Sequence, residues 1–247
     1  VALGYETLYY NTTASNNTAV GYQAGLSNTT GASNTFLGTG VGSSVTTGNH
    51  NILVGRNTGV DTIALTTGSY NILLGNFSRT NATGSTYAIG LGYNITATSG
   101  YTTLGHDSSD IRASHGNVTW ATVSDERYKK DIVNSTAGLT FINALTPRTF
   151  KYKTLGELPE TFNAYEADST EVFKNSYTNH GFIAQEVKAA IDADSSIKDG
   201  FKLWDDRDDG SQEVAEAALI PILVKAIQEL SATNDALVAR ITALEGA

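Results

Sequence analysis

A short motif recurs through the first hundred residues of the chain at a nearly constant interval. It consists of a small or apolar residue, an aliphatic residue and a glycine, and it occurs seven times. Self-similarity at a fixed period is typical of a solenoid or fibre, in which each unit buries its apolar stripe only against its neighbours. The repeat therefore predicts a quasi-one-dimensional stack of short strands joined by glycine-containing turns. The motif glycines are Gly4, Gly21, Gly38, Gly55, Gly75, Gly90 and Gly105, and the aliphatic residues are Leu3, Val20, Leu37, Val54, Leu74, Ile89 and Leu104.

The composition of this segment excludes a helical stack. Residues 1–108 hold 17 of the 24 glycines and are crowded with Asn, Thr and Ser. Glycine in a helix is unfavourable by up to ~1 kcal/mol per residue, and Asn and Thr by somewhat less. One or two aliphatic side chains per unit also make a small core, so we expect several chains to share it. Residues 1–108 are thus predicted to be an all-β repeat shaft.

Two of the repeats resemble units of known fibrous proteins. NTAVGYQAG (17–25) and NTFLGTGVG (34–42) are similar to the head repeats of trimeric autotransporter adhesins and to the shafts of phage tail fibres. Those families wind such units into β-rolls or into interleaved trimeric β-structure. The resemblance implies a trimeric β-roll or interleaved β-structure for the shaft.

Charge separates this shaft from the rest of the chain. Residues 1–108 carry five charged side chains, whereas the remaining 139 residues carry 36. The net charge of -9 argues against a nucleic-acid partner, which requires clustered Lys and Arg. No apolar run approaches the ~20 residues of a membrane span, so we expect a soluble chain without membrane insertion. The absence of Cys excludes a disulfide framework or a thiolate metal site, and the absent initiator Met indicates a piece of a longer protein.

The second half has the pattern of a mixed α and β domain. Apolar residues at helical spacing over 139–145 predict a short helix, which Pro147 ends. Residues 148–153 alternate as a strand does, and residues 180–191 indicate a short strand that runs into a helix.

The last thirty or so residues predict a coiled-coil helix at about 216–245. The seam positions are separated alternately by three and four residues, which is the a/d pattern, and an Asn at an a position is a device that fixes register. Ile at a with Leu at d favours a parallel dimer. The seam consists of Ile220, Leu223, Ile227, Leu230, Asn234, Leu237, Ile241 and Leu244.

Four ordered blocks of the second half carry a further resemblance. They are SDERYKKDI (124–132), LTFINALTPRTFKYK (139–153), GFIAQEV (181–187) and IPILVKAIQEL (220–230). In this order they resemble the C-terminal intramolecular chaperone of phage tail spikes and fibres, which is also classed as peptidase family S74. The resemblance covers about residues 109–247. It implies an α+β chaperone domain at 124–247 with a C-terminal trimeric coiled coil, behind a connector at 109–123.

This resemblance also implies a partner, a place and a reaction. The family drives homotrimerisation of the fibre that precedes it and then cuts itself off by serine/lysine chemistry. The trimer prediction disagrees with the dimer preference of the seam, and we favour the trimer because a fibre repeat upstream would impose its own symmetry. The implied setting is a virion tail fibre or spike, assembled in the host cytoplasm.

The family pattern assigns roles to five residues. Ser124 is the nucleophile and attacks the carbonyl of Val123, so that the Val123–Ser124 bond is cut. Lys129 is the base, since a serine hydroxyl needs one at neutral pH and burial disfavours the ammonium form of a lysine. Asp125 and Arg127 have orienting or structural roles. The enzyme activity expected is a single-turnover autoproteolysis with no external substrate.

Alternatives to this interpretation remain open. The chain is alternatively the tip of a trimeric adhesin that binds a host cell-surface glycan or protein receptor, with a chaperone that does not cut. Exposed tyrosines of the shaft would stack on sugars in that case, although packing between chains accounts for them as well. No cofactor or metal is expected, since the acidic run 205–210 departs from a calcium loop at Arg207, and the histidines lack metal-ligand spacing.

Overall fold

The computed structural model describes residues 1–60, 62–117, 119–194, 197 and 202–246. The chain folds as two units, residues 1–130 and residues 131–247.

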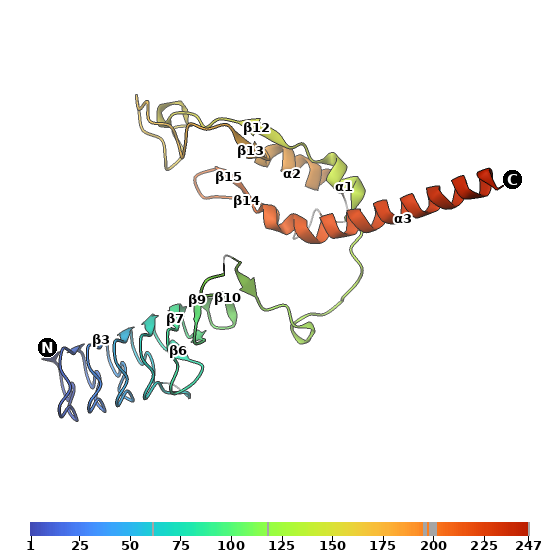
Figure 1. Cartoon of the computed structure of the whole chain (residues 1–247). Coiled ribbons are helices and arrows are strands. Elements are labelled where there is room, and N and C mark those ends of the chain that lie inside the picture. The colour runs from blue at the N-terminus through green and yellow to red at the C-terminus, as the bar shows by residue number, and fades with distance from the viewer. Residues whose placement is uncertain (61, 118, 195–196, 198–201, 247) are drawn as a thin grey trace. The chain divides into compact units, whose positions relative to one another are not determined.

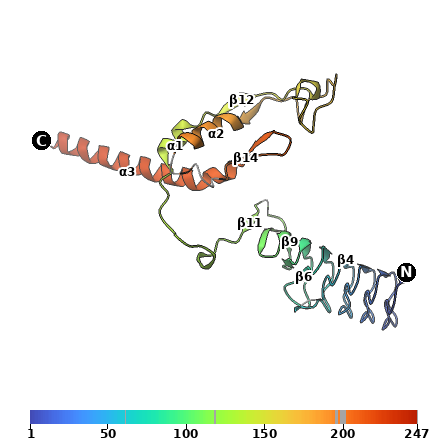
Figure 2. The same ribbon diagram turned by 180° about the vertical axis from the view of Figure 1, so that it is seen from behind.

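The first unit is a β-solenoid of about six turns, in which one short strand of every coil pairs with the next (Figures 1 and 2). Each coil is completed within one chain, which is the β-roll alternative rather than the interleaved one. The parallel strands are β1 (Ala2–Leu3), β2 (Thr18–Val20), β3 (Thr35–Leu37), β4 (Ile52–Val54), β5 (Ile72–Leu74), β7 (Ile89–Tyr93) and β9 (Tyr101–His106). A second parallel pair, β6 (Arg79–Thr80) with β8 (Thr96–Ala97), lies in the later coils.

Two antiparallel strands end the solenoid. β10 (Ser109–Ser114) folds back along β9, and β11 (Ala121–Thr122) pairs with β10. The segment expected to be a connector, residues 109–123, therefore contains two strands of the solenoid's own sheet.

The core of the solenoid differs from the one predicted. The middle residue of each of the three-residue strands β2 to β5 points inward, so that Ala19, Phe36, Leu53 and Leu73 are fully buried. Because successive side chains of a strand point to opposite faces, the aliphatic residue just before each motif glycine points outward. Leu37 and Leu74 are accordingly 48% and 39% exposed. The prediction that these aliphatic residues form the buried stripe is wrong.

The register also corrects the sixth copy of the motif. Leu74 pairs with Leu91, and Leu91 pairs with Leu104. The sixth aliphatic residue is therefore Leu91 rather than Ile89, and the sixth glycine is Gly92 rather than Gly90. The shifted alignment arose because both glycines follow an aliphatic residue.

The motif glycines are required where coils touch. Gly38 has a φ of +137°, and a Cβ placed on it would lie 2.5 Å from the carbonyl oxygen of Gly55 in the next coil. Both the left-handed backbone and the close approach exclude a side chain there.

A column of buried asparagines holds the coils together along the axis. The Oδ1 atom of each of the first three asparagines accepts the backbone N–H of the asparagine in the next coil, and that of the fourth accepts the N–H of Ala88. Each Nδ2 donates to a backbone carbonyl. These amides satisfy backbone groups at a turn that would otherwise be buried without partners. The column consists of Asn17, Asn34, Asn51 and Asn71.

The second unit is a mixed α/β region around one apolar core. Its buried side chains come from α1 (Leu139–Ala144), α2 (Ala184–Ala193), the segment before β14 (Trp204–Asp206) and the start of α3 (Ile220–Glu245). β12 (Arg148–Phe150) pairs antiparallel with β13 (Asn179–Gly181), and β14 pairs antiparallel with β15 (Gln212–Val214). Three short 3-10 helices complete the elements: η1 (Glu126–Tyr128) of the first unit, and η2 (Leu155–Glu157) and η3 (Glu216–Leu219) of the second. The predicted helix at 139–145 and the predicted strand at 148–153 are confirmed with shorter bounds, as α1 and β12. The predicted strand running into a helix at 180–191 is confirmed as β13 followed by α2, which ends at Ala193.

Helix α3 is anchored to α1 at its N-terminal half. Ile222 and Ala226 are buried in the core, and the Oε2 atom of Glu229 accepts the N–H of Leu139 at 2.8 Å. That backbone hydrogen bond, with the Lys225 ammonium beside it, lowers the pKa of Glu229. The C-terminal half of α3 extends beyond the other elements of the unit (Figures 1 and 2).

The apolar residues of the predicted coiled-coil seam do not contribute to this core. They lie on the helix surface next to Ile222 and Ala226, and every one of them is exposed. The seam is thus present as an uncovered apolar face of a single helix.

Candidate functional site

The residues of the predicted cleavage site lie on a single tight turn at the end of the first unit. Asp125 is the N-cap of η1, and its Oδ1 accepts the backbone N–H of Arg127 at 2.9 Å. The cap at the other end is Lys129, whose N–H donates to the carbonyl of Glu126. Because Ser124 and Lys129 flank this one turn with extended backbone on each side, their side chains meet across it.

Ser124 and Lys129 are in direct contact. The Nζ atom of Lys129 lies 2.7 Å from the Oγ atom of Ser124 and donates a hydrogen bond to it. This separation is within the reach expected of a nucleophile and its general base. An ammonium only donates, so base chemistry requires the neutral amine, which accepts the serine proton instead.

Asp125 and Arg127 form an ion pair that closes the turn from outside. The guanidinium of Arg127 contacts both carboxylate oxygens of Asp125, at 2.9 and 2.6 Å. The Arg127 side chain and its backbone N–H lower the pKa of Asp125, and the carboxylate raises the pKa of Arg127. Asp125 therefore stays ionised, and its contacts fix the turn rather than touch the reacting atoms.

The predicted scissile bond, Val123–Ser124, follows directly on the last strand of the solenoid. β11 ends at Thr122, whose Oγ1 donates to the carbonyl of Asp110 at 3.1 Å. Val123 therefore leaves a paired strand and is exposed. A shallow depression beside it is lined by Leu104, Ile111 and Val123 together with the ring of Tyr128 from η1. Tyr128 is not among the residues predicted for the site, and its place on the depression had no signal in the sequence.

Neither member of the pair is buried in a single copy of the chain. Ser124, Lys129 and the neighbouring Glu126 and Lys130 are all exposed. Water around an amine favours its charged form, and removal of that water favours the neutral base. The geometry of the pair is in place, while the dry environment that the chemistry needs is absent from one chain.

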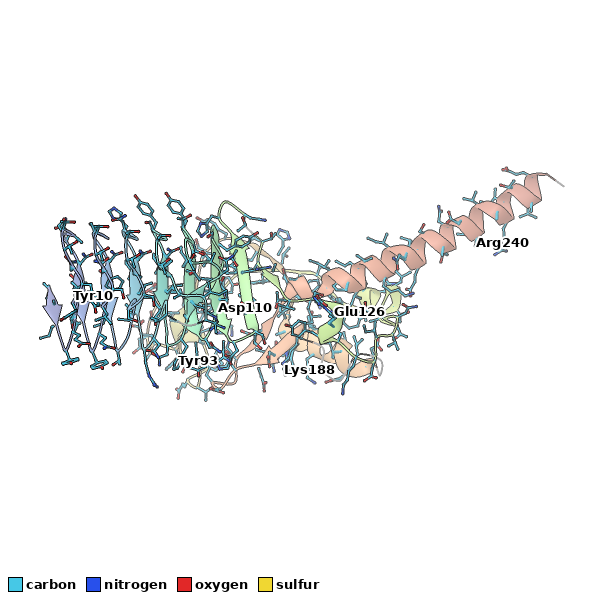
Figure 3. All side chains as sticks on the ribbon, turned by 90° about the horizontal axis from the view of Figure 1, so that it is seen from below. Tyr10, Tyr93, Asp110, Glu126, Lys188 and Arg240 are labelled. Atoms are coloured by element: carbon cyan, nitrogen blue, oxygen red, sulfur yellow. The ribbon has the colours of Figure 1, made fainter. Side chains whose placement is uncertain are left out.

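The shaft tyrosines largely stack on one another. The rings of Tyr70 and Tyr87 are parallel, with centroids 5.1 Å apart, and His50 stacks on Tyr70 at 4.9 Å. Tyr5 with Tyr22 and Tyr93 with His106 form similar pairs. Figure 3 shows such side chains projecting in rows from successive coils. The stacking covers part of each ring, and the tyrosines remain about half exposed.

The acidic run at 205–210 is the turn of a hairpin. The Ser211 hydroxyl and the backbone N–H groups of Asn163 and Ser211 donate to Asp209 and lower its pKa to about 2. Arg207 pairs with Glu213 across the hairpin. Within the described residues no group of three or more His, Asp or Glu side chains is placed to hold a metal ion. The same part of the chain holds no helix with the length and apolarity to cross a membrane.

Fold and site together define a β-solenoid protein with a serine/lysine pair on the turn that follows its last strand. Residues 124–195 match the family model Peptidase S74, described as chaperone of endosialidase, and the match begins at Ser124. Residues 124–195 are therefore similar to the Peptidase S74 chaperone domain, a peptidase-like domain typical of phage tail fibres and spikes, and a β-solenoid precedes them. Strands β14 and β15 and helix α3 lie beyond the matched residues. No curated protein and no solved structure matches the chain.

Proposed function

We propose that this chain is the distal segment of a viral tail fibre or spike, and that its C-terminal domain drives homotrimerisation and then cuts the chain at Val123–Ser124. The observation that carries the proposal is the 2.7 Å contact between Ser124 Oγ and Lys129 Nζ, at the first residues of the matched chaperone domain. The domain remains with the shaft until assembly is complete, and the virion then receives the shaft without it.

The reaction has two steps. In the first, the neutral amine of Lys129 takes the proton of the Ser124 hydroxyl while Oγ attacks the carbonyl carbon of Val123. Lys129 then gives this proton to the nitrogen of Ser124, the C–N bond breaks and leaves a free amine there, and the acyl group of Val123 is held as an ester on Oγ. In the second step water hydrolyses this ester, which leaves a carboxylate on Val123 and restores the hydroxyl of Ser124.

Association of copies supplies what one chain lacks. The exposed seam of α3 is an apolar face at a/d spacing, the surface through which helices form coiled coils. A trimeric coiled coil at residues 220–244 would hold three copies together. Exclusion of water from Lys129 in the assembly would then produce the neutral base. Assembly in this way precedes and permits the cut.

Mass analysis of the freshly expressed chain under denaturing conditions tests the proposal. We expect fragments of residues 1–123 and 124–247 from the natural sequence. Ser124→Ala and Lys129→Arg should stay whole while they still assemble, because arginine keeps the charge of lysine but does not act as a base. Lys130→Arg is the matched control and should be cut normally. Cutting of the Ser124→Ala variant at the same bond refutes the proposal.

One observation favours a second candidate, the tip of a trimeric receptor-binding adhesin with a chaperone that does not cut. Both Ser124 and Lys129 are exposed in a single chain, whereas the reaction needs an amine from which water is excluded. If the natural sequence forms trimers that remain whole after prolonged incubation, this candidate replaces the first.

A further inference from the structure

A continuous row of aliphatic side chains runs along the outer face of the solenoid sheet. Its members are aligned by the strand register, each one directly opposite the next, and we call it the outer stripe. The outer stripe consists of Leu3, Val20, Leu37, Val54, Leu74, Leu91, Leu104 and Ile111.

The outer stripe is apolar, uncharged and uncovered. Leu37, Leu74 and Ile111 are exposed, and the remaining members are exposed or half-buried. A second outward row, two residues earlier in each strand, adds Ile52, Ile72 and Ile89 to its middle. Contiguous apolar surface of this kind on an otherwise polar protein marks an interaction site.

We infer that the outer stripe is the face through which copies of this chain pack, and that packing there covers the depression beside Ser124 and Lys129, so that assembly of the shaft completes the cleavage site. The inference rests on the proposed function and names the surface by which that function is coupled to assembly.

The period of the stripe points to a second copy as its occupant. Its rows are spaced by the distance between paired strands, about 4.8 Å. A partner whose rows have the same spacing can align its leucines with these over the full length of the stripe. A second copy of this chain has the same row spacing because it has the same fold. Since neither outward row of β1 to β9 carries a charge, identical faces meet without like-charge repulsion.

The areas of the stripe and of the exposed α3 seam are each part of what a stable association of copies needs. Seven strand spacings make it about 34 Å long, and a width of about 10 Å gives about 340 Å². The exposed seam of α3 spans residues 220–244, about 36 Å of helix, and offers about 360 Å². A stable interface needs about 800 Å² from each partner. Either surface alone falls well short of this value, and the two together come near it.

The end of the stripe connects it to the site. Leu104 and Ile111, its last two members, line the shallow depression with Val123 and Tyr128. Tyr128 is the residue directly before Lys129 and belongs to the turn that brings Lys129 to Ser124. A copy that covers the stripe to its end therefore covers the turn as well, and removes water from it.

Cysteine cross-linking tests the surface, and the chain lacks natural cysteines that would interfere. Leu37→Cys and Leu74→Cys are made separately in a full chain with Ser124→Ala, which keeps the chain whole. Ile63→Cys is the control, because Ile63 is similarly exposed at 39% but lies between Gly59 and Leu65 on the return segment of its coil. We expect a short bismaleimide to join chains through positions 37 and 74 and not through position 63, and we expect native thiol labelling to be slow only at the first two.

The outcomes separate this inference from the proposed function. A chain that sediments as a monomer contradicts both. A trimer in which positions 37 and 63 are labelled equally fast, without products joined through position 37, refutes the stripe and leaves the proposed function standing.

Cutting gives a second readout. Leu37→Asn with Leu74→Asn should slow the cut at least about tenfold, since two buried leucines contribute more than the about 1.4 kcal/mol that a factor of ten represents. Ile63→Asn should cut at the natural rate. If the double variant cuts at the natural rate while its circular dichroism spectrum shows a folded solenoid, the proposed coupling between stripe and site is wrong.

Discussion

Replacement of Asn51 by alanine tests whether the asparagine column holds the solenoid together. Asn51 is fully buried in the middle of the column and makes four side-chain hydrogen bonds. Its Nδ2 donates to Oδ1 of Asn34 at 3.0 Å and to the carbonyl of Gly68 at 2.9 Å. Its Oδ1 accepts from the backbone N–H of Asn71 at 3.1 Å and from Nδ2 of Asn71 at 2.9 Å.

The size of the effect follows from these bonds. Each contributes a net ~0.5–1.5 kcal/mol, so four contribute about 2–6 kcal/mol. Truncation also leaves the buried N–H of Asn71 without its acceptor, and an unsatisfied buried group of this kind costs ~1–3 kcal/mol. Because the bond estimate and the desolvation estimate overlap, we expect Asn51→Ala to destabilise the solenoid by about 3–5 kcal/mol.

Hydrogen exchange followed by mass spectrometry measures the effect within the right unit. The chain has two units, so one global unfolding free energy would not locate the loss. Exchange in peptides of β4 and β5 should accelerate strongly in Asn51→Ala, while peptides of α2 stay unchanged. Thr39→Ala, a polar truncation at an exposed position of the preceding coil, is the control. A difference between the two variants below ~0.5 kcal/mol, the size typical of surface substitutions, would refute a structural role for the column.

Three further substitutions have defined outcomes. Gly38→Ala should lower the melting temperature clearly more than Gly100→Ala. Both glycines have positive φ, but only Gly38 faces a neighbouring coil within contact distance. Equal decreases in melting temperature would show that the close approach at Gly38 does not matter for stability. Asp125→Ala should slow the cut several-fold, whereas Asp125→Asn should be cut at nearly the natural rate because its side chain still accepts the N–H of Arg127. Equal cutting rates for the two variants would show that the N-cap of η1 plays no part in the reaction. Asp209 is stabilising above its ordinary pKa of 3.8, and this contribution is lost as the pH falls toward its folded pKa of about 2. The stability difference between the natural chain and Asp209→Asn in urea unfolding should thus be present at pH 7 and vanish near pH 2, and a constant difference would contradict the assignment.

The sequence was sufficient to predict a stack of coils but not which residues form its buried core. A repeat with a glycine at each turn indicates coils, and the helices at 139–144 and 184–193 follow from apolar spacing. Hydropathy alone does not separate the two faces of a strand when both carry aliphatic residues. Leu37 and Phe36 are equally apolar, yet one is exposed and the other is buried. The asparagine column was also readable in principle, because an Asn precedes every strand triplet from β2 to β5.

The residues of the candidate site could be predicted from the sequence motif, but their solvent exposure could not. The five-residue spacing of Ser124 and Lys129 gains meaning from Asp125, which caps the turn between them. The exposure of the pair depends on the groups that pack around the turn, and a single chain packs few groups there. Sequence patterns describe a residue's neighbours along the chain, whereas desolvation of Lys129 depends on partners from outside it.

A cut at the proposed site would act differently on the two uncovered apolar surfaces, the outer stripe and the seam of α3. At about 25 cal/mol per Å², the stripe and the α3 seam together represent about 16–18 kcal/mol of apolar burial for each chain, and either alone about 8–9 kcal/mol. Association itself costs an estimated 4–15 kcal/mol, so the joint surface is sufficient where a single one is marginal. A cut at Val123–Ser124 would separate them and leave the shaft with the stripe alone. The persistence of the shaft would then be kinetic, set by its unfolding barrier.

Refolding distinguishes kinetic from thermodynamic persistence of the released shaft. The fragment of residues 1–123, purified as an assembly after the cut, should keep its assembled state on dilution, because its coils unfold slowly. Once unfolded in denaturant and returned to buffer it should fail to reassemble, since the seam residues of α3 are no longer attached. The full-length Ser124→Ala chain, treated in the same way, should recover its assembly, because both surfaces are present on one polypeptide. Sedimentation velocity reads out both samples, and quantitative reassembly of the fragment would mean that the stripe needs no help from the helix.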